Sequence, residues 1–176
     1  PPGTEGMDRD RECGLCVRGL AWSPDSKTLF AGCMGGAGGV AVIDAGRPGW
    51  PALTGRVALG GNPRDLVVSP DGKWLFAASS AGGTVIRAET DSVAEAASSK
   101  NGYDIALTSV KVGGTPRSMR LSPDGKWLFA ALNSDSQVVV VDAHKMEVVA
   151  RVGADSFPVG MDVSPDGRFL WVTSQG

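Results

Sequence analysis

Residues 122–130 read SPDGKWLFA, and the chain holds four versions of this stretch. The others are SPDSKTLFA at 23–31, SPDGKWLFA at 69–77 and SPDGRFLWV at 164–172, so the copies begin 46, 53 and 42 residues apart. Self-similarity at such a period is typical of repeat architectures in which each repeat is one supersecondary unit. The chain is therefore expected to fold as a row of similar units.

Each Ser-Pro-Asp-Gly copy predicts a tight turn between two antiparallel strands. Proline presets its φ near −65°, aspartate bonds back to the local backbone, and glycine adopts a positive φ without a steric cost. Further β-rich runs follow each turn, first at 39–44, 84–87 and 137–142 and then at 56–59, 109–112 and 148–152. Each full repeat thus contains four short strands.

Four antiparallel strands at this spacing match one blade of a β-propeller. A β-solenoid repeats in about half that length, and an immunoglobulin-like sandwich does not repeat one turn at this period. We predict an all-β fold of about three and a half four-stranded blades. The predicted repeats are 17–61, 62–114, 115–155 and the incomplete 156–176, after an N-terminal arm or linker at 1–16.

The last repeat supplies only its first two strands, so a closed four-bladed ring is disfavoured. We expect a piece of a larger propeller, of about 300 residues if it has seven blades. The longest departure from the repeat is 89–106 in the second blade. An elongated hairpin, a helix capped by Asp91 or Ser92, and a projection that docks a partner all fit this segment.

The bulk composition excludes some partners. The 176 residues carry 17 Lys and Arg against 19 Asp and Glu, a net charge of −2, and 42% are hydrophobic. Such a balance gives no reason to expect nucleic acid or an anionic membrane as partner. Apolar runs such as 128–132 are far shorter than the roughly 20 residues that span a bilayer.

A single arginine position recurs in the innermost strand of the blades. Alignment on the Ser-Pro-Asp serine brings Arg18, Arg64 and Arg117 to the same place, and Val159 takes it in the fourth repeat. In a propeller this position surrounds one mouth of the central channel, where guanidinium groups suit a carboxylate or phosphate. The alternative is that each arginine pairs with a nearby acid, for instance Asp65, or with loop carbonyls.

Residues 122–134, with VVVVD at 138–142 and a closing Val-Gly, resemble the YVTN family of propeller repeats. This family is similar to seven-bladed lactonase-like propellers, and the resemblance covers residues 17–176. Asn133 matches the asparagine of the YVTN pattern, where it caps its loop or contacts a ligand. The resemblance implies an exported protein, periplasmic or at the cell surface.

These patterns favour a non-enzymatic binding or scaffold propeller without a cofactor, which holds a protein partner or small anionic ligand at one channel mouth. The alternative is a lactonase-like hydrolase of sugar lactones whose catalytic residues lie largely outside these 176 residues. No catalytic acid, base and histidine cluster can be mapped onto the repeats. One fold hosts many activities, so the choice depends on the site.

The three cysteines leave several possibilities open. Cys13 and Cys16 have the spacing of half a zinc site or a redox pair, but no second such pair follows. A disulfide from Cys33 to Cys13 or Cys16 would staple the arm to the first blade. A subunit that shields a redox partner is a third functional hypothesis. No metal site is expected, because each turn aspartate is alone and a calcium site needs several converging oxygens.

Overall fold

The computed structural model describes residues 16–34, 38–46, 49, 51–99 and 104–176. Blade 1 contains β1 (Cys16–Trp22), β2 (Thr28–Met34), β3 (Gly39–Asp44) and β4 (Ala52–Val57). Blade 2 contains β5 (Pro63–Val68), β6 (Trp74–Ser79), β7 (Thr84–Glu89), helix α2 (Thr90–Ser98) and β8 (Thr108–Lys111). Blade 3 contains β9 (Pro116–Leu121), β10 (Trp127–Leu132), β11 (Gln137–Asp142) and β12 (Glu147–Gly153), and blade 4 contains β13 (Pro158–Val163) and β14 (Leu170–Ser174).

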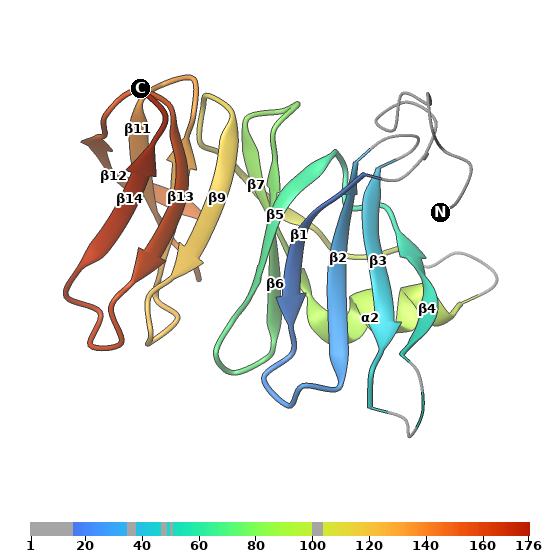
Figure 1. The fold of residues 1–176 in the computed structure, drawn as a ribbon. Helices are drawn as coiled ribbons and strands as arrows, with labels where there is room; N and C mark the ends of the chain where they lie inside the picture. The colour runs from blue at the N-terminus through green and yellow to red at the C-terminus, as the bar shows by residue number, and fades with distance from the viewer. Residues whose placement is uncertain (1–15, 35–37, 47–48, 50, 100–103) are drawn as a thin grey trace.

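Each blade is one antiparallel sheet whose strands follow in chain order. Three sheets have four strands and the sheet of blade 4 has two. The first strands β1, β5, β9 and β13 pack beside one another, and the later strands of each sheet run outward from them (Figure 1). The predicted all-β fold of about three and a half propeller blades is confirmed. The predicted arm lies outside the described residues except for Cys16, where β1 begins.

The four Ser-Pro-Asp turns have one geometry, as their sequence predicts. In blade 3 the Ser122 hydroxyl donates to Asp124 Oδ1 at 2.5 Å and accepts the N–H of Trp127 at 2.9 Å. The Asp124 carboxylate also accepts the N–H of Lys126, and Gly125 takes a φ of +71°. The same hydrogen bonds recur in the other three turns, so a local motif closes every first hairpin.

Apolar side chains fill the spaces between blades. Phe30 of blade 1 is buried with Leu66 and Leu75 of blade 2, and Phe76 of blade 2 is buried with Met119 of blade 3. Burial of such side chains from water stabilises the packing of one sheet on the next. The inner strands are thereby held at fixed positions relative to one another.

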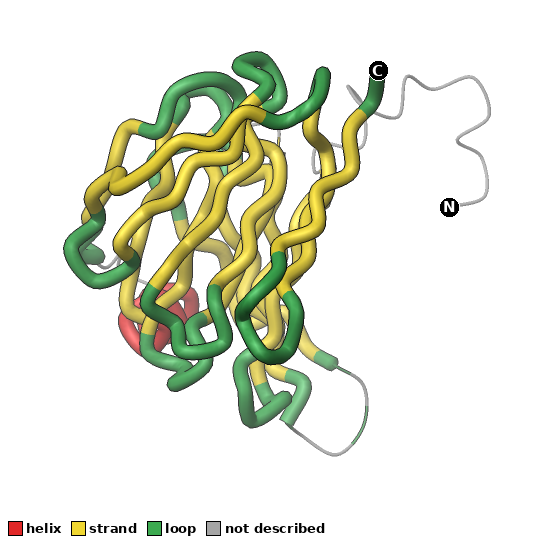
Figure 2. The backbone as a smooth tube through the Cα atoms, turned by 90° about the vertical axis from the view of Figure 1, so that its left-hand side faces the viewer, coloured by secondary structure: helices red, strands yellow, loops and turns green. Residues whose placement is uncertain are grey.

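Helix α2 occupies the segment that departs from the repeat, where a helix was one of the alternatives that the sequence left open. The predicted cap is wrong, because the helix begins after Glu89 and no side chain caps its N-terminus. Val93 and Ala97 are buried in the core shared by blades 1 and 2, and α2 packs on β4 (Figures 1 and 2). Tertiary packing therefore stabilises this helix, which covers the outer part of blade 1. Among the described helices, none is long and apolar enough to cross a membrane.

Candidate functional site

A β-bulge places the recurring arginine in the first strand of blades 2 and 3. Pro63 pairs with Ser79 and Asp65 pairs with Ala78, so Arg64 is an extra residue in β5. Arg117 is the extra residue of β9 in the same way, between Pro116 and Ser118. The register also shifts around Arg18 in β1 and at Val159 in β13. A bulge turns its extra residue out of the regular strand alternation. The same repeat position therefore lies at a register shift in the first strand of all four blades.

The three arginines differ in burial. Arg18 is exposed, whereas Arg64 and Arg117 are half-buried. The Arg64 Nε is inaccessible to solvent and has no hydrogen-bond partner among the described residues. In the part of the chain that the structure describes, no acid forms an ion pair with any of the three. A buried donor without an acceptor is unfavourable, and no acid among the described residues balances the charge of this half-buried guanidinium.

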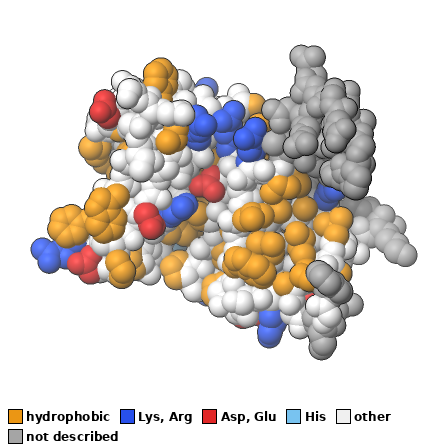
Figure 3. All heavy atoms as spheres, in the orientation of Figure 1, with side chains coloured by type: hydrophobic (Ala, Val, Ile, Leu, Met, Phe, Trp, Pro, Cys, Tyr) orange, Lys and Arg blue, Asp and Glu red, His pale blue; other side chains and the backbone are white. Residues whose placement is uncertain are grey.

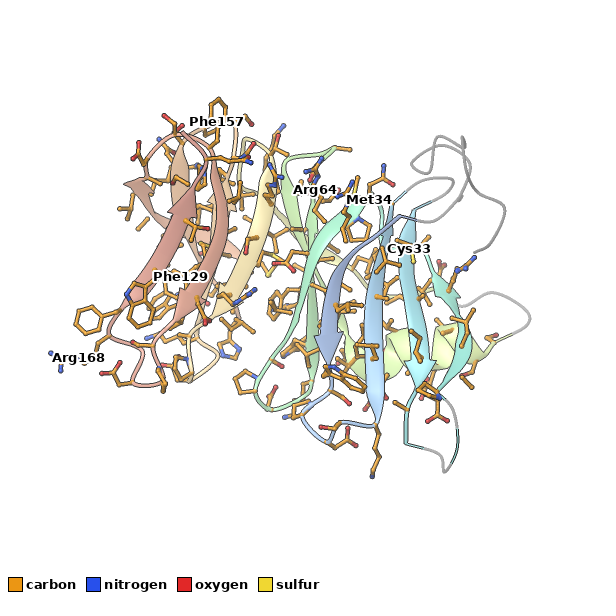
Figure 4. All side chains as sticks on the ribbon, in the orientation of Figure 1. Cys33, Met34, Arg64, Phe129, Phe157 and Arg168 are labelled. Carbon is orange, nitrogen blue, oxygen red and sulfur yellow. The ribbon has the colours of Figure 1, made fainter. Side chains whose placement is uncertain are left out.

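The basic side chains gather at one end of the inner strands. Figure 3 shows Lys and Arg side chains together near the ends where β5 and β9 begin. Figure 4 shows Arg64 at this end, beside Met34 at the end of β2, with Arg168 at the opposite end of the molecule. We call Arg64 and Arg117, with Arg18 beside them on β1, the arginine mouth.

Asp65 lies next to Arg64 in the chain but faces a different arginine. Its Oδ2 accepts the N–H of Met119 in β9 at 2.7 Å and lies 3.6 Å from Nη1 of Arg120. Asp162 of β13 lies 3.7 Å from Nε of the same arginine. The alternative in which Asp65 neutralises an arginine of the mouth is therefore wrong, because its carboxylate bonds to β9.

Burial governs the ionisation of Asp65. Removal from water raises the pKa of this carboxyl, and the Met119 N–H and the Arg120 guanidinium oppose that rise. The Asp65 side chain is only 17% exposed. Both of its oxygens accept backbone N–H groups, since Oδ1 accepts that of Leu66. The geometry indicates a group that fastens β5 to β9.

Sequence reasoning missed Arg120 and Asp162. Both stand two residues before the Ser-Pro-Asp serine, where blades 1 and 2 have Ala21 and Val67. Opposite charges at one repeat position in consecutive blades were the available signal. Arg120 of blade 3 and Asp162 of blade 4 form an ion pair, and Asp65 of blade 2 is the second acid beside Arg120.

Asn133 joins two blades. Its side-chain amide donates to the carbonyl oxygen of Pro158 at 3.2 Å, and its backbone N–H donates to that of Thr115. The Asn133 side-chain amide therefore holds the start of β13 against blade 3. A contact of Asn133 with a ligand stays a prediction.

The predicted disulfide falls largely outside the described residues. Cys33 is buried in β2, and its thiol lies 3.5 Å from the carbonyl oxygen of Ala31. Cys33 is a free cysteine in the structure, so the predicted disulfide from it is not supported; Cys13 and the side chain of Cys16 are not among the described parts. Within the described ranges, no three His, Cys, Asp or Glu side chains are grouped to hold a metal ion.

Comparison with known proteins supports the fold. The family "WD domain, G-beta repeat" matches residues 12–37. Hydrazine synthase of Kuenenia stuttgartiensis superposes with a TM-score of 0.75 at 26% identity, over 89% of this chain and 41% of that one. The β-propeller domain of Swd1 from Myceliophteria thermophila gives a TM-score of 0.66 at 14% identity, over 90% and 49%. The chain is a β-propeller of about three and a half blades.

A third similar structure is that of a putative lactonase. A putative 6-phosphogluconolactonase from Bacteroides uniformis has a TM-score of 0.73 at 20% identity, over 96% of this propeller and 50% of that chain. The present propeller thus spans half or less of the lengths of the three structures compared. Curated protein sequences give no significant match.

Proposed function

We propose that this propeller is a non-enzymatic binding module whose arginine mouth takes a carboxylate or phosphate group. The observation that carries the proposal is Arg64, a half-buried arginine at a bulge whose Nε has no hydrogen-bond partner in the part of the chain that the structure describes. Arg117 stands at the same bulge on the neighbouring strand. Guanidinium groups bind carboxylate and phosphate oxygens through paired hydrogen bonds, so the two side chains suit one acidic ligand.

The acidic group is carried by a small molecule or by a protein partner. The likeness to a WD repeat and to the Swd1 propeller supports a role in protein contacts. Propellers host many activities, so this support comes from the fold and the arginines carry the specific argument. Location in the periplasm or at the cell surface remains a prediction from the family resemblance.

Charge reversal at the mouth tests the proposal. Titration calorimetry of the 176-residue chain with citrate should give measurable binding, which Arg64→Glu and Arg117→Glu should each abolish. Arg168→Glu is the matched control, because this exposed arginine lies at the opposite end of the molecule (Figure 4). Equal citrate affinity in all four proteins would remove the basis of the proposal.

A lactonase-like hydrolase is the second candidate, and two observations favour it. The chain is similar in fold to a putative 6-phosphogluconolactonase, and the pKa of the Asp65 carboxyl is raised by burial in the inner-strand region. Carboxyls with a shifted pKa are candidates for acid–base catalysis. Release of acid from δ-gluconolactone above the uncatalysed rate, lost in Asp65→Asn, would support this candidate over the first.

A further inference from the structure

The contact between Asp65 and β9 lies close to both arginines of the mouth. Asp65 follows Arg64 directly in β5, and its Oδ2 accepts the N–H of Met119, two residues beyond Arg117 in β9. The donor is a backbone group, so the hydrogen bond fixes the position of the β9 main chain itself. It therefore helps to hold the two bulges at a fixed spacing.

Two positive charges of the mouth have no acid beside them among the described residues. Arg120 has two acids within ion-pair distance, Asp65 and Asp162. Arg64 and Arg117 have none among the described residues. Two like charges on neighbouring strands repel each other, and the repulsion is stronger where water is partly excluded. A ligand with one acidic group would neutralise the charge of one of these two arginines, whereas one with two acidic groups would neutralise both.

We propose that Asp65 is a positioning residue that sets the spacing of Arg64 and Arg117, and that this pair takes an anion with two acidic groups, such as a di- or tricarboxylate or a diphosphate. The inference rests on the proposed anion-binding function and adds the ligand class and the role of Asp65. Asp65 acts through the backbone of β9, since its own oxygens already accept N–H groups.

Positioning and simple electrostatics predict opposite effects for one substitution. Asp65→Ser removes a negative charge near the mouth, which by charge alone should tighten anion binding. Serine is too short to reach the Met119 N–H, so a positioning role predicts weaker binding. The repeat itself carries serine at this place in blade 3, Ser118, which favours a folded variant. Asp65→Asn removes the same charge but keeps an oxygen that can accept the N–H.

The measurement is calorimetric titration of the intact 176-residue chain at constant ionic strength with citrate, pyrophosphate and acetate. Wild type should bind citrate and pyrophosphate at least about tenfold more tightly than acetate, which corresponds to about 1.4 kcal/mol. Asp65→Ser should lose about fivefold or more in citrate affinity, and Asp65→Asn should keep or exceed the wild-type value. Asp162→Asn is the control: Asp162 is an exposed acid that bonds no β9 backbone group, so its loss should leave citrate binding unchanged or tighter.

The outcomes distinguish the anion-binding function, the positioning role of Asp65 and the ligand class from one another. Absence of anion binding in wild type, or binding that ignores Arg64→Glu, would defeat the proposed function itself. Citrate binding that depends on Arg64 but tightens equally in Asp65→Ser and Asp65→Asn would overturn the positioning role. Acetate bound as tightly as citrate would overturn the two-acid ligand class. Thermal unfolding of each variant checks that it is folded at the temperature of the titration.

Discussion

Replacing Ser122 by alanine should lower the free energy of unfolding by about 1–2 kcal/mol. The Ser122 side chain is buried, and its hydroxyl accepts the N–H of Trp127 at 2.9 Å. Alanine leaves that N–H without an acceptor at the start of β10, and an unsatisfied group of this kind costs about 1–3 kcal/mol. The other partner, Asp124, is exposed and can bond to water instead, so its loss adds little.

Urea unfolding followed by tryptophan fluorescence measures this change, with linear extrapolation to zero denaturant. Ser134→Ala is the control, because Ser134 is exposed on the β10–β11 turn and bonds only the Thr115 hydroxyl. It should stay within about 0.5 kcal/mol of wild type. The Ser69 turn packs against this turn, with Pro70 beside Gly125, so the double change at Ser69 and Ser122 measures how strongly the two turns are coupled.

A loss below about 0.5 kcal/mol for Ser122→Ala would refute the reasoning. It would mean that proline and glycine alone hold the turn and that the hydroxyl contributes nothing beyond what water supplies. A much larger loss would indicate that the turn also controls packing between blades. The additivity at Ser69 separates these cases, because coupled blades give a sum that is not additive.

Three further perturbations test other parts of the fold. The Ser122 hydroxyl holds the pKa of Asp124 below its ordinary value of 3.8. The stability that the ionised carboxylate contributes is therefore fully present above pH 3.8 and is lost as the pH falls through the lowered pKa. Thermal melts of Asp124→Asn in acid should accordingly depend less on pH than those of wild type. Gly19→Ala should destabilise by about 1–3 kcal/mol in urea unfolding, because a Cβ would lie 2.6 Å from the Cα of Asp65. Phe76→Ala should cost about 3–5 kcal/mol by the same method, since this ring is 1% exposed between blades.

Controls for these changes lie in the same chain. Gly153→Ala should be nearly neutral, because a Cβ there meets nothing within 4 Å. Phe169→Ala should change stability by less than about 1 kcal/mol, because that ring is 59% exposed. Equal losses for Phe169 and Phe76 would contradict the packing described between blades. If the melting temperature of Asp124→Asn depends on acid pH as that of wild type does, the Asp124 carboxylate has the same pKa in the folded and unfolded states.

Local chemistry explains what could be predicted from the sequence. The Ser-Pro-Asp-Gly turn forms from hydrogen bonds within six residues, so its sequence alone specifies its shape. Four Ser-Pro-Asp turns, three of them with a following glycine, recur at blade spacing and predicted the sheets, their strand order and the recurring arginine position. For 89–106 the sequence left a helix open as one of several alternatives; the structure has it at Thr90–Ser98, packed on β4 and without the predicted side-chain cap.

The site itself depends on contacts that no local pattern contains. The bulges at Arg64 and Arg117 appear only when the register of paired strands is known. The bond from Asp65 to Met119 joins residues 54 positions apart, and the ion pairs of Arg120 connect three blades.

The sequence by itself determined the blades, their turns and the place of the arginines in each repeat. Only the tertiary structure decided which arginine has an acid beside it and which has none among the described residues. The physical reason is that turn geometry arises from neighbouring residues, whereas charge pairing depends on distances between strands that pack together only after the blades have formed.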